Sequence, residues 1–171
     1  MTIEGVEIKQ LTTYGDERGF FREVVRVTDN FFANPSNFGQ WSHSRMQKDV
    51  VKAWHYHHVQ TDWWYISAGD VETALYDNRE ESPTYKEKMV FKMGDANPVC
   101  VKIPPGVLHG CRVLSADAHL FYITSHVYDP NEEGRIPYNS DSIDHDWGSD
   151  AIVVDNDKRF FSPTSVRKLL K

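Results

Sequence analysis

Three histidines crowd the segment 54–58, which reads Trp-His-Tyr-His-His, and this is the clearest chemical signal in the sequence. Side chains alternate between the two faces of a β-strand, so a strand here would point His55 and His57 into one interior. A second segment, 103–109, holds a Pro-Pro-Gly turn and delivers His109 at the start of a strand. Convergent neutral imidazoles bind divalent metals or transfer protons, so the cluster predicts a site of one of these two kinds.

The spacing of these residues resembles the two signature motifs of the cupin superfamily. The first motif is a His-x-His pair, here His55 and His57, followed after four residues by the acid Asp62 and then by Gly69. The second motif, Pro-x-Gly-x-x-His, ends at His109. His55, His57, Asp62 and His109 together would suit one divalent zinc, manganese, nickel or iron ion. The residue types alone therefore leave a metal site and a proton-transfer site both open.

Short alternating or β-branched runs recur along the chain, whereas helical periodicity is scarce. The runs cover residues 24–27, 50–54, 63–66, 71–76, 89–93, 99–103, 120–124 and 152–154. Turn-forming residues separate them, and the sequence has no repeat of solenoid or propeller length. The pattern predicts an all-β protein, specifically a cupin-like jelly roll (a double-stranded β-helix), with a short peripheral helix at 165–171.

Composition narrows the class of protein further. The 171 residues fit one domain, 1–171, and 40% of them are hydrophobic, enough for a core. The net charge is −6 with dispersed Lys and Arg, which argues against nucleic acid as a partner. No run approaches the roughly 20 apolar residues that span a bilayer, so we expect no membrane partner and a soluble, cytoplasmic protein. Cys100 and Cys111 lack a metal-binding spacing and are expected to be reduced core residues.

Reading outward from His55, most of the chain resembles the dTDP-4-dehydrorhamnose 3,5-epimerase family, whose fold is a cupin-like jelly roll and whose members are usually homodimers. The stretches that carry the resemblance, in the family's order, are 16–23 (Asp-Glu-Arg-Gly-Phe-Phe-Arg-Glu), Gln40, 43–45, 50–56, Gly69, 77–79, 82–85, 103–110, 114–115, Tyr122 and 128–130. The family-like core covers about residues 16–160. The resemblance implies an epimerase or isomerase of a nucleotide-linked 4-keto-6-deoxy sugar, without a cofactor, in deoxysugar or polysaccharide biosynthesis.

The implied reaction inverts a carbon beside the ketone, at C3, C5 or both, through an enolate. It needs a base on one face of the sugar ring and an acid on the other. By position, His55 resembles the base and Tyr122 resembles the acid. The family also orients its base histidine with a late aspartate, for which Asp157 is the nearest candidate and Asp155 the alternative.

Further positions resemble the family's substrate contacts. They are Arg18 at the diphosphate; Phe21, Glu23 and Gln40 around the nucleotide base; Lys52, in place of a family Arg, near phosphate; His57, in place of a family Gln; and His109 and Tyr128 in the sugar pocket. Lys keeps the charge of Arg but loses its planar two-pronged fork. We therefore expect phosphate attraction at position 52 with a changed geometry.

Asp62 is the main departure from the family, which normally carries a Lys there, thought to stabilise the enolate oxygen. Losing one such donor costs about 3 kcal/mol of barrier, and a carboxylate repels the developing charge. Three interpretations follow. In the first, a metal-independent epimerase replaces the lost donor with His57 or Lys52. In the second, a metal-dependent cupin enzyme holds one divalent ion on His55, His57, Asp62 and His109. In the third, a non-catalytic protein only binds sugar nucleotides. The first is preferred, because base, acid and binding motifs all occur in order.

Overall fold

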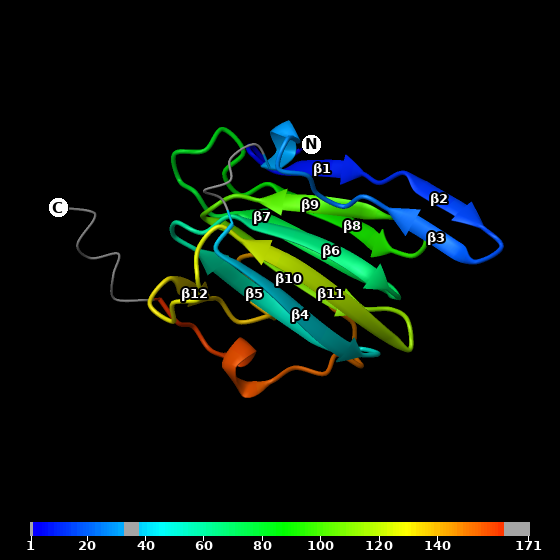
Figure 1. Cartoon of the computed structure of the whole chain (residues 1–171). Helices are drawn as coiled ribbons and strands as arrows, with labels where there is room; N and C mark the ends of the chain where they lie inside the picture. Colours follow the sequence, from blue (N-terminus) through cyan, green and yellow to red (C-terminus); the bar gives the residue numbers. More distant parts are fainter. Residues whose placement is uncertain (1, 33–37, 163–171) are drawn as a thin grey trace.

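Two five-stranded antiparallel sheets dominate the computed structural model, which describes residues 2–32 and 38–162 (Figure 1). The first sheet has the order β1 (Glu7–Gln10), β9 (Val99–Ile103), β6 (Asp62–Ala68), β11 (Asp117–Thr124) and β4 (Gln40–Gln47). The second has the order β12 (Glu133–Arg135), β5 (Val51–His57), β10 (Val107–Val113), β7 (Asp70–Asp77) and β8 (Lys88–Gly94). The predicted all-β, cupin-like jelly roll is confirmed, while the helix predicted at 165–171 lies outside the described residues.

The main core lies between the two sheets, because each strand turns alternate side chains inward. Ile66 and Val101 of the first sheet meet Val71, Leu75 and Val113 of the second, and all five are almost fully buried. This apolar layer fills one part of the sandwich. The remaining interior, beside β4, β5 and β11, is polar and holds the cavity described in the next section.

Two of the predicted strands are wrong. Residues 24–27 form no ladder; Val24 and Val25 instead pack from a loop against a small cluster around Trp63. Residues 152–154 contribute only an isolated bridge between Ile152 and Val50. β-branched residues favour strands mainly because they pack well on a half-buried surface. Val24, Val25 and Val153 find such packing from loops, whereas Val27, Ile152 and Val154 stay exposed.

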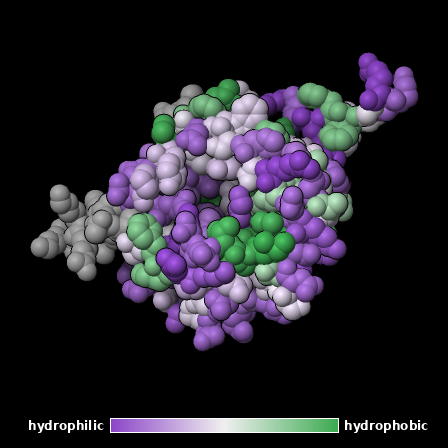
Figure 2. All heavy atoms as spheres, turned by 90° about the horizontal axis from the view of Figure 1, so that it is seen from below, coloured by the Kyte–Doolittle hydropathy of each residue, from purple (hydrophilic) through white to green (hydrophobic). Residues whose placement is uncertain are grey.

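A separate two-stranded sheet, β2 (Thr13–Asp16) paired with β3 (Gly19–Arg22), protrudes from the body of the molecule (Figures 1 and 2). The described helices are short 3₁₀ turns, among them η1 (Asn30–Phe32) and η3 (Asp155–Lys158). None of the helices in residues 2–32 and 38–162 has the length and apolar character needed to cross a membrane.

A β-bulge in β5 decides which of its side chains face the polar interior. His109 of β10 pairs with His55 and Cys111 pairs with Lys52, so three steps along β5 match two along β10. A bulge adds one residue to a strand and shifts the alternation of its side chains. Lys52 and His55 therefore both line the interior cavity, although a regular strand would point them to opposite faces.

Gly110 faces this bulge from β10. A Cβ atom at this position would lie 2.5 Å from the Cβ of Ala53 and 3.0 Å from the carbonyl oxygen of Lys52. Such contacts are far closer than van der Waals packing allows, so the two backbones can approach only because position 110 is glycine.

Asp77, at the end of β7, anchors the loop that follows it. Its fully buried carboxylate accepts hydrogen bonds from Arg79 Nε at 2.8 Å, Ser82 Oγ at 2.5 Å and Thr84 Oγ1 at 2.6 Å. Arg79 also donates to the carbonyl oxygen of Glu4, which ties the N-terminal segment to this loop. Burial raises the pKa of Asp77, but the hydrogen bonds from Arg79, Ser82 and Thr84 outweigh burial and hold it well below its usual range.

We expect Asp77→Asn to lower the free energy of unfolding by about 3 kcal/mol near neutral pH, since it leaves the part-buried Arg79 without its charge partner. A carboxyl whose folded pKa lies below its unfolded value of about 3.9 stabilises the fold above that value and loses this contribution as the pH falls. In urea unfolding, the difference between parent and variant should be full near neutral pH and shrink below about pH 4.

The exposed Asp141 provides the matched control for this substitution. Asp141→Asn should change the free energy of unfolding by less than about 0.5 kcal/mol at any of these pH values. A parent-to-variant difference for Asp77→Asn that stays constant down to pH 2 would contradict the assignment, because it would show that the carboxylate charge contributes nothing.

Candidate active site

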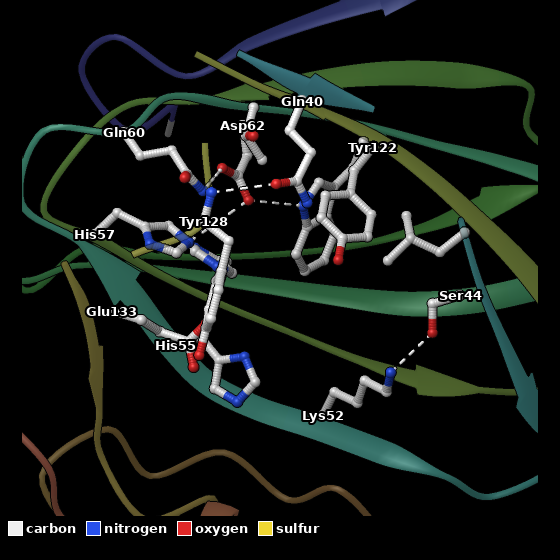
Figure 3. Close-up of a pocket in the computed structure, with 14 residues that line it drawn as sticks. Gln40, Ser44, Lys52, His55, His57, Gln60, Asp62, Tyr122, Tyr128 and Glu133 are labelled. Atoms are coloured by element: carbon white, nitrogen blue, oxygen red, sulfur yellow. Dashed lines mark hydrogen bonds and ion pairs between the residues drawn. The ribbon is translucent and has the colours of Figure 1, made fainter. Parts of the chain in front are cut away.

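A cavity of about 180 Å³ opens between the two sheets (Figure 3). Its lining comprises Gln40, Ser44, Lys52, His55, His57, Gln60, Asp62, Trp64, His109, Leu120, Tyr122, Thr124, Tyr128 and Glu133. Pockets that enclose most of a small-molecule ligand usually measure about 300–1,000 Å³. The cavity therefore suits one part of a larger ligand, such as a single sugar ring, with the rest lying outside.

His55 projects from β5 and is held by a buried carboxylate. Its Nε2 lies 2.8 Å from Asp157 Oδ1, and the side chain of Asp157 is only 3% exposed. An imidazole that donates Nε2–H to a carboxylate keeps its lone pair on Nδ1, which makes Nδ1 the basic atom. Arg135 NH1 contacts the same carboxylate oxygen at 3.4 Å.

Of the two aspartates considered for this contact, the structure places Asp157 against His55. Asp155 pairs instead with Lys158, at 3.1 Å, and its side chain is 79% exposed. Both lie in η3, whose single turn directs Asp157 inward and Asp155 outward. The catalytic roles of His55 and Asp157 stay predictions.

Tyr122 lines the same cavity from the opposite sheet. It belongs to β11, where it pairs with Ser42 of β4 and Trp64 of β6. His55 belongs to β5 in the second sheet, so the phenol and the imidazole approach the cavity from different sheets (Figure 3). Within the described chain, no residue hydrogen-bonds to the Tyr122 hydroxyl. A ring held between the two sheets would thus meet a base and an acid on different sides.

His57, Asp62 and His109 form a buried group in the cavity wall. Each offers one potential ligand atom, and these atoms lie within 4.8 Å of one another. Burial lowers the pKa of His109 most, and the charges of nearby His57 and His55 lower it further. The pKa therefore lies well below its ordinary value, and the ring is neutral. Burial also raises the pKa of the Asp62 carboxyl, against opposing contributions from His57 and from its hydrogen-bond donors.

Three further predicted residues line the cavity: Gln40, Lys52 and Tyr128. Gln40 accepts the backbone N–H of Tyr128 on its Oε1 at 3.1 Å and donates to Ser42 Oγ at 2.8 Å. Lys52 donates to Ser44 Oγ at 2.8 Å. In Figure 3, Lys52 and Ser44 lie at the opposite end of the cavity from Gln60 and Asp62. The cavity therefore has an ammonium group at one end and a carboxyl group at the other.

Arg18, Phe21 and Glu23, predicted to contact the diphosphate and the nucleotide base, do not line the cavity of their own chain. They lie on or next to the protruding β2–β3 hairpin. Arg18 pairs with Asp16, Glu23 pairs with Arg26, and the Phe21 side chain is exposed. Within one chain, the structure does not bring these three residues together with the predicted catalytic groups.

Several cavity residues were missed from the sequence, notably Ser44, Gln60 and Glu133. Gln60 donates to Asp62 Oδ1 at 2.7 Å, but it lies in the turn before β6 begins at Asp62, so no strand alternation marks it in the sequence. Glu133 lies opposite His57 in the β12–β5 ladder. No local pattern indicates that pairing, because 75 residues of intervening chain separate the two strands.

A jelly roll whose interior holds a His–Asp pair and a tyrosine from the opposite sheet has the groups of an acid–base enzyme. The chain belongs to the dTDP-4-dehydrorhamnose 3,5-epimerase family, whose sequence profile matches residues 1–163. It is 40% identical over 151 residues to the Bacillus subtilis spore coat polysaccharide biosynthesis protein SpsL, covering 86% of this chain and 98% of that protein. It is 30% identical over 167 residues to the Escherichia coli dTDP-4-dehydrorhamnose 3,5-epimerase, covering 94% and 90%.

Solved structures agree with the sequence relatives. The structure of the 3,5-epimerase RmlC from Legionella pneumophila, in complex with dTDP-4-keto-L-rhamnose, is similar with a TM-score of 0.83 and 31% identity, covering 92% of this chain and 87% of that one. The epimerase from Sulfolobus tokodaii has a TM-score of 0.81 and 28% identity, covering 93% and 90%. The predicted family, fold and enzyme class, a sugar-nucleotide epimerase, are confirmed.

Proposed function

We propose that this enzyme inverts a carbon beside the ketone of a dTDP-linked 4-keto-6-deoxy sugar, with His55 as the base and Tyr122 as the acid. The observation that carries the proposal is the His55–Asp157 pair, which shares a cavity with Tyr122 of the opposite sheet. The volume of about 180 Å³ supports a sugar ring as the enclosed part of the substrate.

The chemistry consists of two proton transfers. His55 Nδ1 removes the proton from the carbon beside the ketone; the C–H electron pair becomes the enolate double bond, and the carbonyl π pair moves to oxygen. Tyr122 then donates its proton to the opposite face of that carbon, which inverts it. A proton passing through solvent from the His55 imidazolium to the Tyr122 phenolate restores the enzyme. Because only protons move, the proposal needs no organic cofactor.

Incubating the folded protein with a dTDP-4-keto-6-deoxy sugar in D₂O tests this function directly. We expect deuterium at the carbon beside the ketone, together with the epimerised product, in NMR and mass spectra. Saturable substrate binding without any deuterium incorporation would contradict the proposal and would indicate a protein that only binds sugar nucleotides.

We also propose a homodimer in which the β2–β3 hairpin of one subunit completes the partner's site. Tyr14, Phe20 and Phe21 are 60%, 56% and 60% exposed on this hairpin. An isolated two-stranded hairpin is marginal in water, and clustered exposed rings indicate a contact surface. Arg18 lies on the same element but outside its own cavity, so contact with a second subunit would account for its assigned role at the diphosphate.

Hybrid dimers test whether the hairpin contributes to the active site of its own chain or to that of the partner chain. We expect Arg18→Ala and His55→Ala homodimers to be strongly impaired, because the first loses a phosphate contact and the second the base. If the hairpin acts on the partner, a purified hybrid of the two variants contains one intact site and recovers about half of the parental activity. A hybrid no more active than its parents would contradict the proposal, as would a monomer in light scattering.

A cytoplasmic location is part of the same proposal. Cys100 and Cys111 are both free and buried in the described structure. Burial raises the pKa of each thiol to about 12, which leaves both unreactive near neutral pH. Free thiols are typical of proteins that work in a reducing compartment, where disulfides rarely persist.

A further inference from the structure

Arg135 of β12 lies beside the His55–Asp157 pair but outside the active-site cavity. Its NH1 is 3.4 Å from Asp157 Oδ1, the oxygen that also contacts His55 Nε2 at 2.8 Å. Arg135 is not among the residues that line the cavity. The guanidinium therefore reaches the base through a buried carboxylate, and a sugar ring enclosed in the cavity does not contact it.

The fold holds the Arg135 side chain in one direction. Its backbone pairs with His55 in the β12–β5 ladder and with Phe161 through an isolated bridge. Its Nε and NH2 donate to Glu133 Oε1 at 2.9 and 2.5 Å, which leaves NH1 for Asp157. A guanidinium is planar and rigid, so contacts that fix one edge also fix where the remaining N–H groups point. The placement of NH1 is thus set by β12 and does not depend on Asp157.

The charge of Arg135 matters because Asp157 is buried. The side chain of Asp157 is 3% exposed, and a buried carboxylate is costly unless a cation or several donors pair with it. Among the described residues, Asp157 forms ion pairs with His55 and Arg135, and a neutral imidazole brings no charge. Lys158, the next residue, pairs with Asp155 instead. Arg135 is therefore the permanent positive charge that compensates this carboxylate.

Without that charge, a proton can settle on the His55–Asp157 pair in two ways, and both remove the basic atom. If Asp157 takes the proton, its O–H donates to Nε2, and the neutral ring of His55 carries its own hydrogen on Nδ1. If His55 takes the proton, the imidazolium has hydrogen on both nitrogens. Only a carboxylate beside a neutral ring leaves the lone pair on Nδ1, where the proposed reaction requires it.

We propose that Arg135 is a positioning residue of the epimerase: it holds Asp157 as a carboxylate directed at His55 Nε2 and so keeps Nδ1 free to act as the base. The pair becomes a chain that runs from Glu133 and Arg135 of β12 through Asp157 of η3 to His55 of β5. The effect on the reaction rests on the proposed function, whereas the placement of hydrogen on the His55 ring does not.

Nitrogen NMR of the histidine rings tests this role without a substrate. In the folded full-length parent near neutral pH, we expect hydrogen on His55 Nε2 and a bare Nδ1. Arg135→Gln and Arg135→Met remove the charge with side chains of different polarity, and each should move the hydrogen to Nδ1 or add a second one. The signals of His55 are identified by their loss in His55→Gln. Near-UV circular dichroism verifies that each variant is folded.

Arg45→Gln is the matched control for removing an arginine from an ion pair. Arg45 lies on β4 in the other sheet, pairs with Asp117 at 2.7 Å and has a side chain that is 67% exposed. Its loss should leave the ring signals of His55 and the rate of deuterium incorporation at the parental values.

Deuterium incorporation measures the consequence for the reaction. We expect Arg135→Gln to lower kcat about 10- to 100-fold with KM within about twofold of the parent, because a misdirected base costs rate and leaves binding intact. Arg135→Lys restores a positive charge without the planar fork and should recover at least about a third of the parental kcat. In an Asp157→Asn background, which has no carboxylate to hold, adding Arg135→Gln should change the rate by less than about twofold.

The outcomes separate this inference from the proposed function. Parental His55 signals in both charge-removing variants, or an equal loss of rate with and without the Asp157 carboxylate, overturn the positioning role. A raised KM with the parental kcat also overturns it, because Arg135 would then bind the substrate, as a phosphate contact does. If the His55 signals respond as expected but the parent incorporates no deuterium, the proposed function fails while the positioning of His55 by Arg135 stands.

Discussion

The His55→Ala variant is expected to lose solvent deuterium incorporation at the carbon beside the ketone by at least about 100-fold, since a positioned general base contributes roughly 10²–10⁴ in rate. Alanine removes the Nδ1 lone pair and leaves Asp157 buried without its imidazole partner. No other described imidazole contacts Asp157, so no second base has the same support. The measurement is the rate of deuterium appearance by NMR, under conditions in which parent and variant bind the nucleotide sugar equally.

His119→Ala controls for the loss of an imidazole as such. His119 lies on β11 but stacks with His43 outside the cavity, so its removal should leave deuterium incorporation within about twofold of the parent. If His55→Ala incorporated deuterium at the parental rate, His55 would not be the base. If both variants slowed equally, the effect would come from damage to the fold.

Hydrophobic patterning found most of the strands that bury apolar side chains, including β5 and β11 beside the cavity, but it missed β4, whose inner face is polar. β9, predicted at 99–103, matches the structure because nearly all of its residues are buried. β4 was missed: its inward positions include Gln40, Ser42 and Ser44, so the strand carries the period of two without the apolar signal. The same feature that hid this strand, a polar inner face, is what makes it part of the site.

The parts of the site that could be predicted are those whose residues lie close together in the sequence. The spacing of His55 and His57, read as a strand, placed both in one interior, although the bulge that brings Lys52 to the same side leaves no pattern in the sequence. The contact between His55 and Asp157 spans 102 residues, and choosing between Asp155 and Asp157 needed the η3 turn. Resemblance to the family identified these positions, and only the three-dimensional structure shows which of them meet.

For the residues of the β2–β3 hairpin, the structure of one chain does not bring the predicted contacts together. Resemblance assigned Arg18, Phe21 and Glu23 to the nucleotide, yet all three lie away from the cavity of their own chain. Resemblance to the family predicts the role of each residue, but it does not say whether the residue serves the cavity of its own subunit or that of a partner. A second subunit would place the hairpin at the partner's cavity, and the hybrid-dimer experiment measures whether Arg18 of one subunit serves His55 of the other.

Tyr122→Phe should separate the two proton transfers. The substitution removes one hydroxyl and keeps the ring between β4 and β6, so the cavity retains its shape. His55 still abstracts the proton, exchanges it with solvent and returns deuterium to the same face. We expect unreacted substrate to gain deuterium at no less than about one-tenth of the parental rate, whereas the inverted product forms at least about 100-fold more slowly.

The ratio of exchange to inversion is the decisive quantity in this experiment, because it is independent of enzyme concentration and of the fraction folded. A loss of binding or of packing lowers both rates together and leaves the ratio unchanged. Tyr85→Phe, which removes a hydroxyl from a tyrosine outside the cavity, should leave both rates and their ratio at the parental values. Full inversion by Tyr122→Phe would remove Tyr122 as the acid and shift that role to solvent or to another group at the cavity.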